Sequence, residues 1–196
     1  MRIGKRSALL IVCGLIAVGW PSAAYNQEGR SSLRVNGTVV GIGGRLAGRS
    51  APFSLIVNSP SSVAQVRELT EVLASGQDAL LNALSKMDAG RVQIGTGVGV
   101  PANAIIVEPW GEGGTKLTVF YQRNLSFYEL RYGTRSQDYP IGYAEMFLDR
   151  NGHGAGTLIP AARVRLKNGN TWEVEDFGVY PARLMGLRSS GRLVPR

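Results

Sequence analysis

The only histidine, His153, lies in the segment Asp149-Arg150-Asn151-Gly152-His153-Gly154, between two stretches that look like strands. Asp149 and Asn151 occupy the first and third positions of an EF-hand-like calcium loop, and Gly154 the sixth. The twelfth position, where such a loop needs a bidentate Glu, is Pro160, so too few oxygen ligands remain. We therefore expect a plain Asn-Gly hairpin turn here, and no bound metal or cofactor.

Carboxylate chemistry is the other candidate. Four acidic residues lie in or near predicted strands: Glu129, Asp138, Glu145 and Asp176. Any two of them could form the carboxyl pair of a glycosidase. Ion pairing that only stabilises the fold is the competing explanation, for example between Asp138 and Arg135. Sequence separation does not say which of the four are close in space, so both interpretations stay open.

Two glycine-rich segments could be mistaken for phosphate-binding loops. They run from Gly41 to Gly48 and from Gly95 to Gly99. Neither has a Lys-Ser/Thr pair or the G-x-G-x-x-G spacing, and a nucleotide site needs a helix N-terminus after the loop. Close backbone packing or a β-bulge is the better prediction for both.

Tyrosine and arginine gather in the segment 121–139. Both residue types are overrepresented in interface hot spots, and a basic aromatic surface could bind an acidic envelope polymer or an acidic protein. Arginines of this segment have no evident cross-strand partner, so they would keep their capacity for bidentate contacts. The competing interpretation places the rings in the core and rim of a barrel. The predicted partner-binding residues are Arg123, Tyr128, Arg131, Tyr132, Arg135 and Tyr139.

The first 24 residues have the three parts of a secretory signal. Basic residues at the start are followed by an apolar run from Ala8 to Val18 and by the small residues Ser22-Ala23-Ala24, which predicts cleavage before Tyr25. A membrane anchor is the first alternative, but a run of about 11 residues is shorter than the roughly 20 that span a bilayer. A lipoprotein signal at Cys13 is the second, although Val12 is bulky for that site.

Cys13 is the only cysteine, so the mature chain would contain no thiol and would depend on its hydrophobic core alone. Removal of the leader takes away Arg2, Lys5 and Arg6 and lowers the net charge from +8 to +5. An exported, moderately basic domain is expected in the periplasm or outside the cell, with no transmembrane segment after processing and no nucleic acid as partner. The last four residues, Leu193-Val194-Pro195-Arg196, match what a thrombin cut leaves behind and equally a natural basic tail.

Two helices are predicted between residues 62 and 90. Ser62 and Gln65 form a capping-box pattern before an apolar stripe that ends near Gly76. Asp78 could cap a second helix, with Gly90 as its stop. Neither apolar face is wide enough for a stable isolated helix, so this αα-hairpin should dock on a sheet.

The remainder is rich in β-branched and aromatic residues interrupted by Gly, Pro and Asn, which predicts consecutive short strands. Short links favour antiparallel neighbours, and such a meander closes into a barrel or a sandwich. The expected strands are 38–42, 53–57, 104–108, 116–122, 127–132, 143–149, 156–167, 171–177 and 182–187.

One hairpin can be predicted to the residue. Apolar and charged residues alternate before and after Asn168-Gly169-Asn170, and only a three-residue loop keeps both apolar sets on one face. This register places Leu166 opposite Trp172, Val164 opposite Val174, Arg165 opposite Glu173 and Arg163 opposite Glu175. The two charged pairs would each stabilise the hairpin by about 0.2–1 kcal/mol.

From Ala51 to Arg188 the order of short motifs resembles that of a family of uncharacterised secreted bacterial proteins with no assigned activity. The motifs are Ala51-Pro52-Phe53, Gly76-Gln77-Asp78-Ala79-Leu80, Gly133-Thr134-Arg135-Ser136, Asp138-Tyr139-Pro140-Ile141-Gly142, Gly156-Thr157-Leu158-Ile159-Pro160-Ala161-Ala162, Val174-Glu175-Asp176-Phe177-Gly178 and Pro181-Ala182. The resemblance covers about two thirds of the chain. It implies an exported α+β domain and no functional residue.

We therefore expect an α+β protein, mostly an antiparallel β meander with one αα-hairpin packed on it. Its parts would be a signal peptide (1–24), a flexible lead-in (25–36), one domain (37–188) and a basic tail (189–196). With one histidine and no mature cysteine, the chain has few groups for acid-base or nucleophilic work. The expected function is a non-catalytic envelope or extracellular module that binds a polymer, a protein or an apolar ligand. A carboxylate-dependent, glycosidase-like hydrolase is the alternative.

Overall fold

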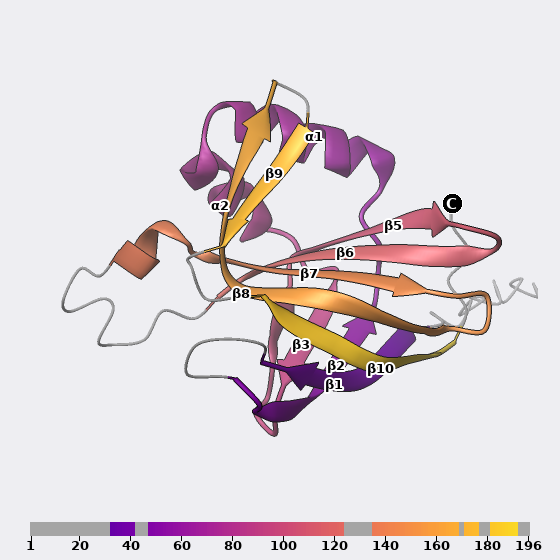
Figure 1. Cartoon of the computed structure of the whole chain (residues 1–196). Coiled ribbons are helices and arrows are strands. Elements are labelled where there is room, and N and C mark those ends of the chain that lie inside the picture. The colour runs from indigo at the N-terminus through magenta and orange to yellow at the C-terminus, as the bar shows by residue number, and fades with distance from the viewer. Residues whose placement is uncertain (1–31, 42–46, 124–134, 169–170, 177–180, 192–196) are drawn as a thin grey trace, which may run out of the picture.

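A computed structural model describes residues 32–41, 47–123, 135–168, 171–176 and 181–191 of the chain (Figure 1). Its elements are β1 (Leu33–Val40), β2 (Ser50–Val57), α1 (Val63–Ala74), α2 (Gln77–Leu84), β3 (Gly90–Ile94), β4 (Val100–Ala102), β5 (Ala104–Trp110), β6 (Gly114–Gln122), the 3-10 helix η2 (Arg135–Asp138), β7 (Ile141–Leu148), β8 (His153–Lys167), β9 (Thr171–Asp176) and β10 (Ala182–Ser190). The ten strands of this described part form one antiparallel sheet in the order β4-β3-β2-β1-β10-β8-β7-β6-β5, with β9 paired to β8 off this path.

The sheet curls into a nearly closed barrel, which confirms the predicted α+β class. Closure occurs where β4 runs directly into β5, because the intervening Asn103 donates its backbone N–H to Phe120 O of β6 at 2.9 Å. Inward-facing side chains from all around the sheet fill the interior. Among them are Phe53, Leu55, Leu117, Met146, Leu158 and Leu184.

A bulge in β10 lies where this strand pairs with β1, because two steps along β1 oppose three along β10. Pairing between these strands shifts register between Asn36 and Thr38. A Cβ on the intervening Gly37 would lie 2.6 Å from Leu187 Cδ2 and 2.9 Å from Met185 O, so only glycine allows the two backbones to approach this closely.

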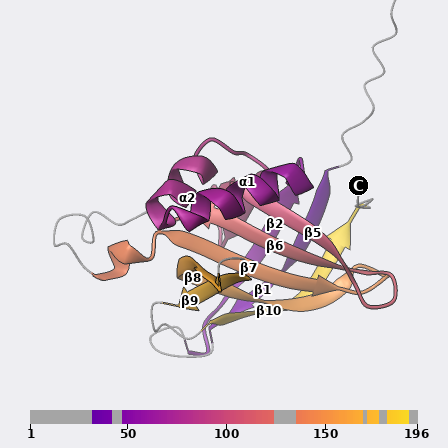
Figure 2. The same cartoon turned by 90° about the horizontal axis from the view of Figure 1, so that it is seen from above.

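The helical hairpin lies on the outer face of the sheet, over β5 and β6 (Figure 2). The capping box at the start of α1 is confirmed: Ser62 Oγ accepts from Gln65 N at 3.3 Å, and Ser62 N donates to Gln65 Oε1 at 2.8 Å. Leu69 and Leu73 of α1 and Leu80 and Leu84 of α2 are buried against the sheet. They belong to a second hydrophobic cluster, separate from the barrel interior, that also contains Ala104, Phe120, Ile141 and Val164.

The second helix differs from the prediction at both ends. It begins at Gln77 after an N-cap at Gly76, so Asp78 lies in the first turn and not at the cap. It ends at Leu84, and Gly90 is the first residue of β3 and not the helix stop. The chain leaves the helix early because Asn103 Nδ2 donates to Leu84 O at 3.0 Å and to Met87 O at 3.2 Å, which satisfies carbonyls that a longer helix would have used.

The long strand β8 pairs with different strands along its two halves. Its first half pairs with β7 and β10, and after a register shift at Pro160 and Ala161 its second half pairs with β9. The resulting β8–β9 ribbon rises from the barrel beside α1 and α2 (Figure 1). Its predicted register is confirmed at all four pairs, from Leu166 opposite Trp172 to Arg163 opposite Glu175.

Ion pairing in this ribbon follows the prediction only in part. Arg165 Nε contacts Glu173 Oε2 at 2.7 Å, as expected. Glu175, however, lies 3.7 Å from Arg165 Nη1 and accepts a hydrogen bond from Tyr139 Oη at 2.9 Å. Glu175 therefore pairs with Arg165 and Tyr139 and not with the facing Arg163.

Other predicted boundaries also shift. β1 begins at Leu33, so the expected lead-in to residue 36 extends too far, and β10 runs to Ser190, past the expected domain end at 188. β3 and β4 were not among the expected strands, because glycine dominates the segment between them. The strand expected at 127–132 lies outside the described residues.

Candidate functional site

The aromatic and basic segment is only partly described. Arg123 Nε donates to Tyr139 O at 2.7 Å, and Arg123 N donates to Pro140 O at 3.0 Å, so this arginine ties two chain segments together. Tyr139 is only 5% exposed and its hydroxyl donates to Glu175. The expectation that Arg123 lacks a partner and that Tyr139 lies on a contact surface is therefore wrong. Tyr128, Arg131 and Tyr132 lie outside the described residues, as does the side chain of Arg135 at the start of η2.

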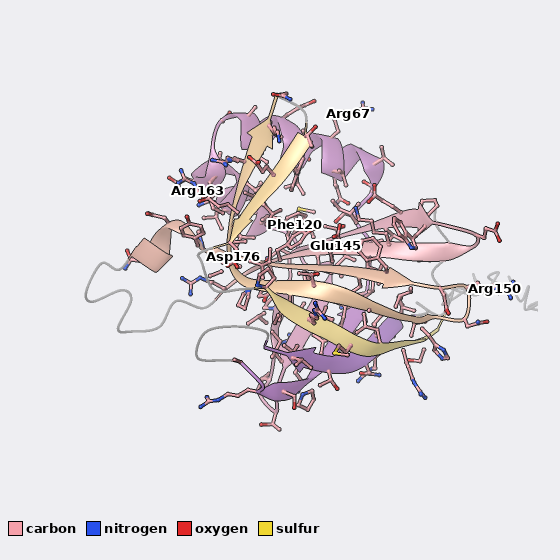
Figure 3. All side chains as sticks on the ribbon, viewed as in Figure 1. Arg67, Phe120, Glu145, Arg150, Arg163 and Asp176 are labelled. Atoms are coloured by element: carbon pink, nitrogen blue, oxygen red, sulfur yellow. The ribbon has the colours of Figure 1, made fainter. Side chains whose placement is uncertain are left out.

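Of the four acidic residues considered as catalytic, the three that the structure describes lie in three different elements. Asp138 is exposed in η2, and its backbone carbonyl accepts from Gln77 Nε2 at 2.9 Å. Glu145 lies in the middle of β7, and Asp176 ends β9 (Figure 3). Glu129 is outside the described part of the chain.

The turn at His153 is a hairpin turn, as expected. Asp149 Oδ1 accepts the backbone N–H groups of Asn151 at 2.8 Å and His153 at 2.9 Å, and Gly152 has a φ of 76°. These bonds lower the pKa of the exposed Asp149 carboxyl. Among the described residues, no group of three or more metal-binding side chains is found.

Neither glycine-rich segment precedes a helix. The segment from Gly41 leads into strand β2, and the one from Gly95 to Gly99 turns β3 into β4. Gly95 and Gly99 have φ values of 75° and 78°, a backbone conformation that explains these two glycines. A Cβ on Gly99 would lie 2.5 Å from Val92 O, so the predicted close backbone packing is confirmed there, whereas residues 42–46 of the first segment lie outside the described part of the chain.

A groove of about 310 Å³ lies between α1, the β9 edge of the ribbon and the outer face of β5, β6 and β7. Side chains that alternate with the barrel core form its floor, because successive residues of a strand point to opposite faces. Thr118 lies opposite Glu145, and Phe120 lies opposite Tyr143. The lining is Val66, Ile106, Glu108, Lys116, Thr118, Phe120, Tyr143, Glu145, Trp172 and Val174.

Three aromatic rings make the inner end of this groove. The centroid of Phe120 is 5.4 Å from that of Tyr143 and 5.0 Å from that of Trp172, and both pairs are tilted. Trp172 is fixed in place because its Nε1 donates to Thr70 Oγ1 of α1 at 2.9 Å. This bond joins the ribbon to the helix and closes the groove at that end.

A charged triad lies at the open end. Lys116 Nζ is 3.1 Å from Glu145 Oε1 and 3.4 Å from Glu108 Oε2. The Lys116 and Glu145 side chains are 28% and 26% exposed, whereas Glu108 is 51% exposed. Burial alone would lower the pKa of Lys116, but the hydrogen bond and charge of Glu145, together with Glu108, leave that pKa above its usual value.

Tyr143 contributes a neutral hydroxyl between the triad and the rings. Burial, followed by the charge of Glu145 and a hydrogen bond to it, raises the pKa of this hydroxyl well above its usual value. Tyr143 therefore keeps its proton at physiological pH. With one ammonium, two carboxylates and this neutral hydroxyl, the groove carries a net charge of about −1.

A larger depression of about 630 Å³ lies beyond the open end, between the β5–β6 and β7–β8 turns. Trp110 and Phe147 stand on its rim with ring centroids 4.5 Å apart, and Trp110 is 50% exposed. Its other lining residues are mostly in turns, such as Gly111, Glu112 and Asn151. We consider the smaller groove the better candidate site, because three packed rings and a linked charged triad on strands line it, whereas the depression is lined mostly by turn residues.

Of the groove residues, only Glu145 was singled out from the sequence as a candidate site residue. Lys116 and Glu108 lie in the middle of strands whose other outward residues are mostly apolar or hydroxylated, which is the signal that could have identified them. No member of a set of protein-family models, curated proteins or solved structures matches this chain. No helix in the described residues is long and apolar enough to cross a membrane.

Proposed function

We propose that this protein is an exported, non-catalytic module that binds a small amphipathic ligand in the groove beneath α1. The observation that carries the proposal is the ordering of groups along the groove, from the three fixed rings at the closed end to the Lys116 triad at the open end. Apolar pockets with a few converging polar groups are the usual form of a small-molecule site. The volume of about 310 Å³ is at the lower end of that class, so it suits a small ligand better than a polymer.

The polar end of the ligand should be neutral or positively charged. Glu145 and Glu108 together exceed the charge of Lys116, and a cation beside the ring faces of Tyr143 or Phe120 is attracted further. A carboxylate at the same position would face two anions and one ammonium already bonded to both. A matched pair of ligands that differ only in this charge therefore tests the proposal.

The test uses a dansyl-labelled alkylamine and the dansyl-labelled alkyl carboxylate of equal chain length, with the rise in dansyl fluorescence as the measure of binding. We expect the amine to bind more tightly, by roughly tenfold for a net difference of about 1.4 kcal/mol. Val66→Trp should block the groove and weaken the binding of both probes. Thr38→Trp, on the exposed outer face of β1, is the matched control.

If the two probes bind equally well, and if Val66→Trp changes the binding of neither, the groove is not the ligand site. A result in which only the carboxylate binds would overturn the charge assignment.

The glycosidase-like alternative has one observation in its favour. Glu108 and Glu145 contact the same Lys116 ammonium, so the distance between their nearest oxygens cannot exceed the sum of the two N–O distances. That upper limit is within the range of separations found in catalytic carboxyl pairs. Both carboxylates are bonded to Lys116, however, so neither can donate a proton without first losing an ion pair. Glu145→Gln should abolish hydrolysis of nitrophenyl glycosides if that alternative is correct, whereas the binding proposal expects no hydrolysis by the wild type.

Export is part of the proposal and rests on the leader pattern of residues 1–24 and on the resemblance to secreted bacterial proteins. Expression of the full chain in a bacterial host, followed by mass spectrometry of the periplasmic fraction, tests it. A mature protein that begins at Tyr25 is expected. Recovery of the uncleaved chain in the cytoplasm would contradict export.

A further inference from the structure

Charge is distributed unevenly over the described part of the barrel. β1, β2, β3, β4 and β10, with the described residues of the turns between them, contain no Asp or Glu. Of these strands, β1 and β10 lie on the side of the barrel away from α1 and α2 (Figure 1). The same strands and turns carry five exposed arginines: Arg34, Arg49, Arg91, Arg183 and Arg188.

Two of these arginines, Arg49 and Arg183, lie at one end of the barrel, and the side chain of Arg91, which starts nearer the other end of β2 opposite Ile56, extends toward them. Arg183 pairs in register with Val40, the last residue of β1, and Arg49 immediately precedes β2. The β3–β4 turn is at the same end, because Gly95 N donates to Pro52 O at 2.8 Å. Arg91 reaches this turn, with Nη1 3.4 Å from Gly99 O.

Apolar side chains are exposed at this same end. Val98, in the β3–β4 turn, is 87% exposed, and Ile94, just before the turn, is 39% exposed. On the neighbouring wall, Met185 of β10 lies opposite Thr38 and is 50% exposed. Single exposed apolar residues are common, but here they occur with arginines on strands and described turns that carry no carboxylate, which gives this part of the barrel a distinct character.

We propose that this end of the barrel docks on a membrane surface that contains anionic phospholipids. Arg49, Arg91 and Arg183 would attract the lipid phosphates, and guanidinium groups can bind phosphate oxygens in a bidentate manner. Val98 and Ile94 would enter the boundary between headgroups and acyl chains, where apolar side chains are stabilised.

Charge complementarity alone would also suit a soluble polyanion. The apolar turn favours the membrane, because Val98 gains nothing from a hydrated polymer. This surface shares no residue with the lining of the ligand groove, so the inference does not depend on the proposed function.

The experiment is sedimentation of the full chain, expressed without its leader, with vesicles of phosphatidylcholine alone or with added phosphatidylglycerol. Binding should require phosphatidylglycerol and weaken as salt rises, since exposed charges are screened. Arg49→Ser, Arg91→Ser and Arg183→Ser combined should reduce vesicle affinity by about 100-fold, at about fivefold for each arginine near the surface. The matched control combines Arg67→Ser, Arg150→Ser and Arg163→Ser, which removes the same charge elsewhere (Figure 3).

A second variant tests the apolar contact. Ile94→Ser with Val98→Ser leaves the charge unchanged and should abolish the binding that remains at high salt. All these side chains are exposed, so circular dichroism is expected to show an unchanged fold.

Three outcomes would overturn the proposal. The first is an equal loss of binding in the two triple variants. The second is failure of the wild type to bind vesicles that contain phosphatidylglycerol. The third is arginine-dependent binding to polyphosphate beads by a protein that does not bind vesicles. The last outcome would identify a soluble polyanion as the partner.

Discussion

Asn103 connects three parts of the molecule through one buried side chain. Its Nδ2 donates to the carbonyls of Leu84 and Met87 at the end of α2, and its Oδ1 accepts from Gln122 N at 2.7 Å. The residue is 5% exposed and stands where β4 passes into β5. It therefore fixes the helical hairpin, the barrel seam and the end of β6 relative to one another.

Replacing Asn103 by Leu should be strongly destabilising. The backbone groups it satisfies would remain buried without partners, and each such group costs about 1–3 kcal/mol. We expect a loss of about 3 kcal/mol in the free energy of unfolding, measured by urea denaturation. Asn82→Leu, at an exposed position of α2, is the control and should change stability by less than about 0.5 kcal/mol. Similar effects of the two changes would show that the buried amide does not hold the seam.

Tyr121 makes the barrel sensitive to alkaline pH. It is 5% exposed inside the barrel, and burial raises the pKa of its hydroxyl to about 12, slightly offset by Arg123. The ring lies against Gly142, where a Cβ would overlap it, so the hydroxyl cannot easily move to solvent.

The sign of the pH dependence follows from linkage. The unfolded chain ionises this tyrosine near pH 10, whereas the folded chain does so near 12, so the folded state binds more protons between these values. The contribution of Tyr121 to the free energy of unfolding should therefore be fully present below pH 10 and be lost as pH rises toward 12. Phenolate absorbance during alkaline titration follows the ionisation, and Tyr121→Phe should make the fall in the free energy of unfolding smaller, with the part due to Tyr143 remaining. A Tyr121 that titrates near 10 in the folded protein would contradict this account.

At the scale of elements, α1 depends on its capping box. Ser62→Ala removes the acceptor for Gln65 N and should destabilise the protein by about 1 kcal/mol, which is typical of N-cap loss. Ser75→Ala, at the C-cap of the same helix, is the matched control because the capping bonds there come from its backbone N–H. Thermal unfolding monitored by circular dichroism compares the two. An equal shift for both variants would assign the effect to serine loss in general and not to the cap.

The features predicted correctly from the sequence are local. The capping box involves residues three apart, and the β8–β9 register follows from alternation on either side of a three-residue loop. Both are decided by neighbours in the chain, so spacing alone identifies them.

The candidate groove depends on contacts that are remote in sequence. Thr70 and Trp172 are separated by 102 positions, and Lys116 contacts Glu145 only because β6 and β7 pair in one register. Alternation indicated which residues share a strand face but not which strands are neighbours. The short strand β4 was missed for a different, local reason, since the glycine-rich turn before it obscures its three-residue pairing with β3.

At the scale of the whole molecule, two hydrophobic clusters share the same strands. Consecutive residues of β6 face opposite ways: Tyr121 belongs to the barrel interior, and Phe120 belongs to the cluster under the helices. Separation of β6 from the rest of the sheet would therefore expose both clusters to solvent. A sheet common to two cores should therefore couple them into one cooperative unit.

We predict a single unfolding transition for both clusters. In a Trp110→Phe variant expressed without the leader, Trp172 is the only tryptophan, and its fluorescence reports on the helix-covered cluster. Far-ultraviolet circular dichroism reports mainly on the barrel strands. The two signals should give the same urea midpoint and the same m value, because the strands that join the clusters must separate before either is exposed. Leu80→Ala, which removes a fully buried contact from the helix-covered cluster, should lower both midpoints together, at a cost of about 2–5 kcal/mol. If only the fluorescence midpoint falls, the helical hairpin and the ribbon unfold separately from the barrel and the coupling through β6 is too weak to join them.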